Sequence, residues 1–399
     1  MFCAFRGLIE MNVAVVHNIP SPYRLHLFEK MYAWLSSRGI GFKVNFMSDM
    51  SKGHGERPLA WRNPKMSFPH RYWKDCGIGC HHLNLGLVLK VLWHRQDILF
   101  VGSAFDTFTG ILVSLFGRAK VKIAWTEGNT KTLGKMKGLK GFVKRLVFSR
   151  YDYVAVPGLE GERYIAAHQA ITRMKMPRPV LLPNLVDETR FKPRHMWPLG
   201  DINRIRSEVG CSDETKLCIV PARLEWYKGL LEMFALLTPE MLSGWKILIM
   251  GSGSLKEGVE SSIAIQGLAD HVTIKDLIPY AEMPLYYAAA DLFLFPSLMD
   301  RNPLSVVEAV HSGLPVALSD QVGNIHEGVH EGINGWVLPV KDSARFGQTL
   351  KMVFSADIET LKRMGCKSYE AIAPFWRSDF AVDRFLQSIV DAYNNHGMH

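Results

Sequence analysis

The chain has 399 residues, 47 of them basic and 38 acidic, which gives a formal net charge of +9 at neutral pH. Hydrophobic residues make up 48% of it, which excludes a disordered or collagen-like protein. At roughly 100–200 residues per domain, this length predicts two domains. The positive charge favours anionic partners such as phosphates or acidic lipid surfaces, and by itself it does not indicate nucleic acid.

We expect a cytoplasmic protein without a metal ion. The longest stretch without Asp, Glu, Lys or Arg has 14 residues, 76–89, against about 20 for a membrane-spanning helix. The N-terminus has neither the apolar core nor the cleavage site of a secretory signal. Six scattered cysteines are typical of reduced thiols. Cys76 and Cys80 precede His81 and His82, but no second pair stands at zinc-ligand spacing.

In the first half of the chain, short apolar runs alternate with helical patterns. A β-branched run at 12–17 is followed by a Pro/Ser turn and by a helical pattern from Leu25 to Leu35, which Gly39 ends. The later runs that predict strands are 42–46, 98–101, 121–125, 153–156 and 180–182. Such runs are typical of strands buried on both faces of a parallel sheet, with helices as crossovers. We therefore predict an α/β domain over residues 1–190.

The second half repeats the pattern. The runs that predict strands are 217–220, 246–250, 272–274, 292–295 and 315–318. We predict a hinge rich in Pro and charge at 191–205, a second domain at 206–375, and a C-terminal helix at 376–399 that packs back on the first domain. The predicted architecture is two doubly wound, Rossmann-like α/β domains that face each other across a cleft. Ligands of such sheets bind at the carboxyl ends of the strands.

The segment after the run at 292–295 carries two acids and a helix start. Asn302 and Pro303 are predicted as the N-cap and first residue of a helix. The first turn then offers the N–H groups of Leu304, Ser305 and Val306. With the helix dipole they form an anion site, bracketed by Asp300 and Glu308, whose carboxylates can accept hydrogen bonds from sugar hydroxyls. The alternative is an ordinary capped helix with Glu308 in solvent.

Two cations and two glycines follow neighbouring runs. Arg223 and Lys228, five residues apart after the run at 217–220, can clamp a diphosphate and offset the charge it develops as a leaving group. The alternative is a pair of solvated surface charges. Gly251 and Gly253 allow a backbone to approach a ligand closely. No G-x-G-x-x-G motif follows the first strand, where a dinucleotide fold would place it.

These segments together resemble a known family. The matching segments are 183–187 with Phe191, 222–224 with 228–229, 251–253, 280–291, 296–309, 313–316 and 332–336. The second half is similar to the nucleotide-sugar-binding domain of glycosyltransferase family 4, which has the GT-B fold. The first half is similar more loosely, through 19–24 and 125–128.

The resemblance implies roles for the C-terminal residues. Arg223 and Lys228 would hold the donor diphosphate, and the backbone near Leu277 would contact the base. Glu308 would be the second glutamate of the family's E-x7-E motif, which binds the ribose. Asp300 stands in the place of the first glutamate, where the family contacts the transferred sugar, and is one methylene shorter. The resemblance therefore makes Asp300 a predicted catalytic residue.

For the N-terminal half, the resemblance implies an acceptor side. The family's N-terminal loop would bring Pro22, Tyr23 and Arg24 near the donor phosphates and the acceptor. In the C-terminal E-x7-E motif, Arg301 and Asn302 replace residues that are commonly small in the family. Many members have a histidine after the strand that matches 98–101. Here the nearest polar candidates for catalysis are Asp106, which can instead cap the helix beginning at Thr107, and Glu127. His17 is interpreted as structural.

Residues 128–151 form a basic amphipathic stretch without acidic side chains. Its cations are Lys131, Lys135, Lys137, Lys140, Lys144, Arg145 and Arg150. We favour docking on an anionic inner leaflet. The alternative is a core-facing helix with a solvated basic face.

The family resemblance therefore predicts a retaining, metal-independent glycosyltransferase that needs no cofactor besides its nucleotide-sugar donor. Its acceptor would be a glycan or a lipid-linked saccharide, in the synthesis of cell-surface polysaccharide. Two alternatives remain open: a degenerate module that binds a nucleotide or glycan without turnover, and a GT-B nucleotide-sugar epimerase. The sugar, the linkage and the oligomeric state are not predicted.

Overall fold

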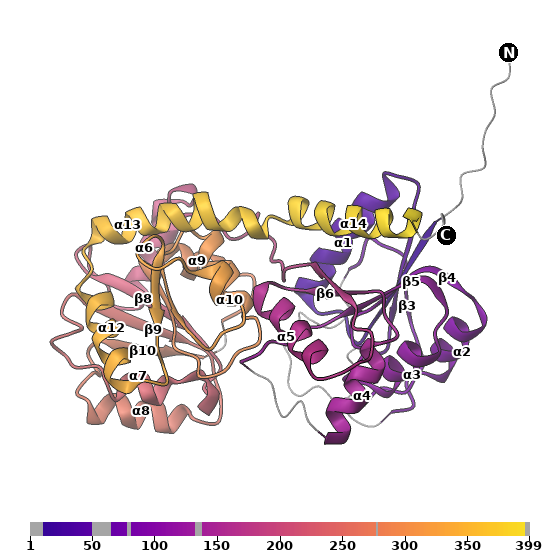
Figure 1. The fold of residues 1–399 in the computed structure, drawn as a ribbon. Helices are drawn as coiled ribbons and strands as arrows, with labels where there is room; N and C mark the ends of the chain where they lie inside the picture. Colours follow the sequence, from indigo (N-terminus) through magenta and orange to yellow (C-terminus); the bar gives the residue numbers. More distant parts are fainter. Residues whose placement is uncertain (1–10, 50–64, 78–80, 132–137, 277, 396–399) are drawn as a thin grey trace, which may run out of the picture. The chain divides into compact units, whose positions relative to one another are not determined.

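The computed structural model describes residues 11–49, 65–77, 81–131, 138–276 and 278–395. The chain divides into two compact units. Unit 1 holds residues 1–157, 161–185 and 378–399, and unit 2 holds residues 158–160 and 186–377. Figure 1 shows the ribbon with its element labels.

Unit 1 is built on a seven-stranded sheet in the order β3-β2-β1-β4-β5-β6-β7, with all described neighbours parallel. Its strands are β1 (Asn12–His17), β2 (Gly41–Phe46), β3 (His70–Tyr72), β4 (Gln96–Val101), β5 (Ala119–Trp125), β6 (Tyr153–Val156) and β7 (Arg178–Leu181). Its helices are α1 (Pro22–Ser36), α2 (Leu85–Trp93), α3 (Phe108–Phe116), α4 (Gly138–Phe148), α5 (Leu159–Ala170, whose first two residues count with unit 2) and α14 (Ser378–Asn395).

Unit 2 is built on a six-stranded parallel sheet in the order β10-β9-β8-β11-β12-β13. Its strands are β8 (Lys216–Pro221), β9 (Trp245–Met250), β10 (Val272–Lys275), β11 (Leu292–Phe295), β12 (Val316–Ser319) and β13 (Gly335–Leu338). Its helices are α6 (Leu199–Glu208), α7 (Leu230–Phe234), α8 (Lys256–Ile265), α9 (Met283–Ala289), α10 (Leu304–His311), α11 (Ile325–Gly328), α12 (Ser343–Ser355) and α13 (Ile358–Lys367), with short 3-10 turns at η2 (Arg194–Met196) and η3 (Trp226–Lys228).

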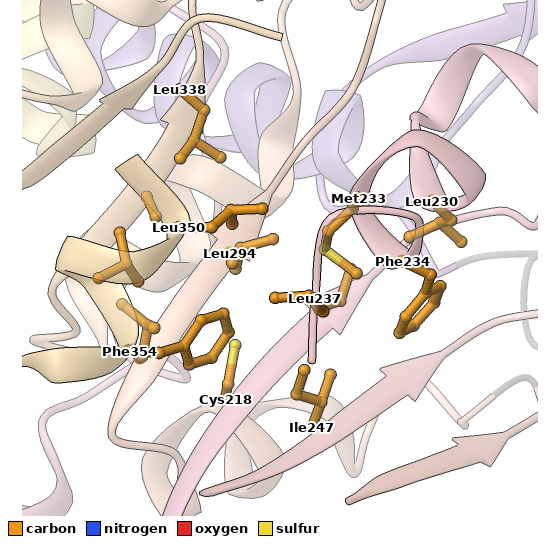
Figure 2. Close-up of a cluster of buried hydrophobic side chains, with 14 of the residues drawn as sticks. Cys218, Leu230, Met233, Phe234, Leu237, Ile247, Leu294, Leu338, Leu350 and Phe354 are labelled. Atoms are coloured by element: carbon orange, nitrogen blue, oxygen red, sulfur yellow. The ribbon is translucent and has the colours of Figure 1, made fainter. Parts of the chain in front are cut away.

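The core of unit 2 lies between the sheet and the helices α7 and α12. Figure 2 shows side chains from strands, such as Cys218, Ile247 and Leu294, directed toward Phe234 of α7 and Phe354 of α12. All five are buried. This packing explains why the apolar runs of the second half form strands that are covered by helices.

The two sheets confirm the predicted α/β class and every predicted strand, with shifts of one or two residues at the ends. Strands β3 and β13 were not predicted from the sequence. β3 has three exposed residues and no apolar run, and β13 is a four-residue strand that begins with a glycine. Both lie at a sheet edge. β3 is exposed there and lacks an apolar pattern, whereas β13 is mostly buried but short.

Residues 191–205, predicted as a hinge, lie inside unit 2 instead. The Arg194 guanidinium contacts Asp291 at 2.7 Å and donates to the carbonyl oxygens of Ala289 and Ala290. The charge of Arg194 thus joins this segment to the end of α9. The chain passes between the units near residues 157–161, 185–186 and 377–378.

The C-terminal helix α14 is part of unit 1. Its Asp383 accepts a hydrogen bond from Trp34 of α1 at 2.8 Å, and its Phe385 packs on Phe100 of β4 with ring centroids 5.5 Å apart. No helix among residues 11–49, 65–77, 81–131, 138–276 and 278–395 has the length and apolarity to cross a membrane.

Candidate functional site

The sheet order of unit 2 creates a switch point between β8 and β11. The chain runs from β8 outward to β9 and β10, then returns to the other side of β8 with β11. Connections on opposite sides leave an opening outside the carboxyl ends of the two strands, where ligands of doubly wound sheets bind. The loops after β8 and β11, at 222–229 and 296–303, flank this point.

Lys228 and Asp300 meet at this switch point. The Lys228 ammonium lies 2.5 Å from Asp300 Oδ2, although the two residues are 72 positions apart. The side chains are 11% and 19% exposed. Lys228 Nζ also lies 4.9 Å from the ring centre of Phe295, the last residue of β11. The structure thus brings together Lys228, predicted to hold the donor diphosphate, and Asp300, predicted as a catalytic residue.

Backbone contacts between the two loops hold Lys228 in place. The carbonyl oxygen of Tyr227 accepts hydrogen bonds from the Ser297 hydroxyl and the Leu298 N–H, each at 2.9 Å. Gly229 has φ +68°, and a Cβ there would stand 2.2 Å from the Pro296 carbonyl oxygen. A residue other than glycine would therefore push the loops apart.

Helix α10 begins one residue later than predicted. Its N-cap is Pro303, in an extended conformation, and no side chain caps the first turn. Asn302 was predicted as the cap, but it precedes that position; it is buried, and its Nδ2 has no hydrogen-bond partner. The Asn324 side-chain amide donates to the Pro303 carbonyl oxygen at 3.0 Å. The start of α10 therefore presents Leu304 and Ser305 N–H groups with no side-chain cap in competition.

Glu308 is a partly buried acid on α10, four residues beyond Leu304. The Tyr287 hydroxyl of α9 donates to Glu308 Oε2 at 2.7 Å. Burial raises the pKa of Glu308 to about 7, while the hydrogen bond from Tyr287 and the charge of Arg190 oppose this rise. The alternative of a fully solvated Glu308 is wrong. Sequence reasoning missed Tyr287, although it lies in the 280–291 segment that matched the family.

The remaining predicted donor residues have different environments. Arg223 is exposed, and in the described part of the chain it forms no ion pair or side-chain hydrogen bond. A Cβ on Gly251, which has φ +150°, would lie 2.1 Å from the Ala222 carbonyl oxygen, and one on Gly253 would meet the Leu224 backbone. These glycines let two loops pack together without a clash. Leu277 lies outside the described residues.

In unit 1, Arg24 contacts three residues that the sequence singled out, namely Glu127, Asn184 and Trp125. Its guanidinium pairs with the Glu127 carboxylate and donates to Asn184 Oδ1 at 2.9 Å. The Asn184 amide donates to the same Glu127 oxygen at 3.0 Å. Arg24 also lies 3.7 Å from the ring centre of Trp125. The network orients Glu127 and pairs its charge with that of Arg24.

Arg24 is presented by the first turn of α1. Pro22 is the first helical residue, and Ser21 is the N-cap. Arg24 also lies 4.9 Å from the ring centre of Tyr23. The three predicted acceptor-side residues therefore form one short segment after β1, at the β1–β4 switch point of the unit 1 sheet.

Asp106 follows β4 at the same switch point and is exposed. Its alternative role as a helix cap is wrong: Thr107 is the N-cap of α3, and its hydroxyl accepts from the Gly110 N–H at 2.9 Å. His17 is buried and its Nδ1 is unpartnered. A Cβ on Gly102 would lie 2.2 Å from that nitrogen. His17 packs in the core, as its structural interpretation predicts.

No cluster of three or more potential ligand side chains suited to a metal occurs within the residues that the structure describes. His82 Nδ1 lies 2.5 Å from Asp75 Oδ2. Cys76 is exposed and reduced, and Cys80 lies outside the described residues.

The amino-acid sequence is similar to those of known glycosyltransferases. Residues 201–371 match the family described as "Glycosyl transferases group 1". The chain is 29% identical to the alpha-galactosylglucosyldiacylglycerol synthase of Streptococcus pneumoniae, over 70% of this chain and 72% of that protein. Alignments with several other curated glycosyltransferases span less than half of those proteins.

Solved structures share the fold. HepE from Anabaena, in complex with UDP and glucose, has a TM-score of 0.70 at 16% identity, over 96% of this chain and 100% of that one. Sucrose-phosphate synthase from Thermosynechococcus elongatus has a TM-score of 0.69 at 14% identity, with the same coverage.

Both units are Rossmann-like, and the chain matches solved structures of the GT-B fold, which confirms the predicted fold class. The chain is a glycosyltransferase of this fold, and its residues 201–371 match the model of the group 1 glycosyl transferases.

Proposed function

We propose that this glycosyltransferase moves a sugar from a nucleotide-sugar donor to a glycan or lipid-linked saccharide, with retention of anomeric configuration and without a metal ion. The observation that carries the proposal is the Lys228–Asp300 pair beside the uncapped start of α10. Retention and synthesis of cell-surface polysaccharide follow from the family resemblance.

A donor diphosphate at this point would meet a cation and a helix N-terminus. Lys228 is buried, so its charge acts on a nearby phosphate with little screening by water. The Leu304 and Ser305 N–H groups and the helix dipole add partial positive charge. As the bond from the anomeric carbon to the phosphate oxygen breaks, these groups stabilise the negative charge on the departing diphosphate. Arg223 is free to join them from its exposed loop.

The nucleotide ribose would lie against Glu308. The ionised carboxylate accepts hydrogen bonds from two hydroxyls, and Tyr287 fixes its orientation. Because the pKa of Glu308 is about 7, donor binding should strengthen as the pH rises from 6 to 8. UDP-sugars are the first donors to test, since HepE, which shares this fold, was solved with UDP.

The acceptor would bind at the carboxyl ends of the strands of the unit 1 sheet. Arg24 and Glu127 form a fixed polar pair there, and exposed Asp106 can orient an acceptor hydroxyl. In the retaining reaction the proton of that hydroxyl passes to the departing phosphate as the new glycosidic bond forms. The similarity to a glycolipid synthase supports a lipid-linked acceptor.

Contact with an anionic membrane would come through the start of α4. Leu139 and Phe142 are 78% and 46% exposed there, and Lys140 is exposed between them. Exposed apolar side chains beside cations are typical of interfacial helices. Lys135 and Lys137 of the predicted basic stretch lie outside the described residues.

Donor hydrolysis tests the transferase proposal. The protein is incubated with UDP-, GDP-, ADP- and dTDP-sugars, and release of the nucleotide is followed. We expect slow hydrolysis of one donor class, lowered at least 100-fold in Lys228→Ala and unchanged in Lys341→Ala, an exposed lysine of the same unit. Tight binding without turnover would contradict catalysis, and release of a 2-epimeric sugar would indicate an epimerase.

Vesicle co-sedimentation tests the membrane contact separately. We expect binding to anionic but not neutral vesicles, and weaker binding when Leu139 and Phe142 are both changed to Ser. Ile265→Ser is the matched control, because Ile265 is 80% exposed on α8. Equal, negligible binding of the wild-type protein to both vesicle types would remove this part of the proposal.

A further inference from the structure

Unit 1 contains a cavity that belongs to neither the donor nor the acceptor side. Its volume is about 530 Å³, and its walls come from the amino ends of β1, β2 and β4 with parts of α1 and α2. The polar side chains in the wall include Lys43, Lys90, Arg95 and Asp97. Residues 18–24 and Asp106 follow the carboxyl ends of β1 and β4. The cavity lies at the amino ends of these strands, on the opposite side of the same sheet from the acceptor residues.

The cavity's cations lack acidic partners. Among the described residues, Lys43, Lys90 and Arg95 form no ion pair. Burial lowers the pKa of Lys90, and the charges of Lys43 and Arg71 lower it further. Arg71 lies 4.2 Å and Lys90 5.7 Å from the ring centre of Trp73, so both cations are held beside one aromatic side chain. Mutually repelling cations around a cavity cost stability unless an anion joins them.

Asp97 offsets only part of this charge. One of its oxygens accepts the Asn12 N–H at 3.0 Å, and the other accepts the Tyr393 hydroxyl at 3.1 Å. The carboxylate is therefore used to join the start of β1 to α14, and the three cations in the wall outnumber it.

We propose that this cavity binds a phosphate monoester, with Lys43, Lys90 and Arg95 as its ligands. Arg95 offers a planar fork for two phosphate oxygens, and the two lysines act as point charges on the third. The volume admits an ester of the size of a sugar phosphate or of a lipid headgroup. The inference does not depend on the proposed transferase reaction, because no residue of the donor or acceptor side takes part.

Lysine labelling gives a local readout. The protein is treated with an acetylating reagent at constant ionic strength, and acetylation of each lysine is measured by mass spectrometry. One arm adds glycerol 3-phosphate, and the other adds phosphatidylcholine vesicles with or without phosphatidic acid. We expect labelling of Lys43 and Lys90 to slow several-fold, with no change at Lys175, an exposed lysine beside Asp152 before β6, which does not border the cavity.

Variants connect the protection to the cavity. In Lys43→Gln, the glycerol 3-phosphate concentration that half-protects Lys90 should rise about tenfold, the loss of one charge-assisted contact. Lys175→Gln removes the same charge elsewhere and should leave that concentration unchanged. Circular dichroism verifies that both variants are folded.

Each outcome decides the proposal. Protection by glycerol 3-phosphate supports a soluble ester, and protection only by vesicles with phosphatidic acid supports a lipid headgroup. If neither arm slows the labelling of Lys90, or if Lys175 is protected equally, the cavity does not bind phosphate esters and the proposal is overturned.

Discussion

Glu308→Gln should stabilise the free protein at alkaline pH while it weakens donor binding. Burial raises the pKa of Glu308 from its ordinary 4.5 to about 7. Because the pKa in the folded state is the higher one, ionisation of this carboxyl costs stability. The cost is absent below about pH 4.5, grows as the pH rises, and is complete above about pH 7.

The magnitude follows from the shift. At about 1.4 kcal/mol per pKa unit, a shift from 4.5 to about 7 corresponds to about 3 kcal/mol as an upper limit. Glu308 is only partly buried by surface exposure, so we expect about 2 kcal/mol. Glutamine has the same shape and still accepts the Tyr287 hydroxyl, so it removes the charge and little else.

Urea unfolding of the free protein at pH 5 and pH 8 measures this effect. The variant should exceed the wild type's free energy of unfolding by less than about 1 kcal/mol at pH 5 and by about 2 kcal/mol at pH 8. Glu257→Gln, at an exposed glutamate of α8, is the control and should change neither value. A Glu308→Gln protein no more stable than the wild type at pH 8 would refute the reasoning that Glu308 is a strained, functional carboxylate.

Three further substitutions test the packing around the two sites. Gly102→Ala should cost about 2 kcal/mol, because the new Cβ would overlap the buried His17 ring; an unchanged melting temperature would contradict this close contact. Glu127→Gln should cost about 2 kcal/mol in urea unfolding, because it leaves the buried Arg24 without a counter-charge, and a neutral effect would mean that water already screens the pair. Phe234→Ala should cost about 3–5 kcal/mol in the same assay, and a loss below about 1 kcal/mol would show that the unit 2 core can collapse around the gap.

Much of the fold follows from local patterning. Runs such as 217–220 and 292–295 are apolar on both faces because helices cover both sides of a parallel sheet, and this pattern is readable without coordinates. The edge strand β3 has no such pattern, since its three residues are exposed. The stretch at 191–205 has the composition of a linker, yet Arg194 ties it to Asp291, a contact 97 residues distant that composition does not encode.

In the site, too, the residues could be predicted from local motifs, but their contacts could not. Motif spacing placed Lys228 and Asp300 each in a loop after a strand, but their contact depends on β8 and β11 being neighbours in the sheet. Tyr287 was missed because its role arises only from the packing of α9 on α10. The start of α10 was misplaced by one residue because Pro303, with ψ 123°, stays extended and takes the N-cap position itself.

The central claim is that Lys228 and the start of α10 receive the donor diphosphate. A crystal structure of the protein with the nucleotide diphosphate that binds best tests it most directly. The account predicts phosphate oxygens within hydrogen-bonding distance of Lys228 Nζ and of the Leu304 and Ser305 N–H groups, with a ribose hydroxyl on Glu308. A nucleotide bound at another edge of either sheet, with Lys228 still paired only with Asp300, would contradict it.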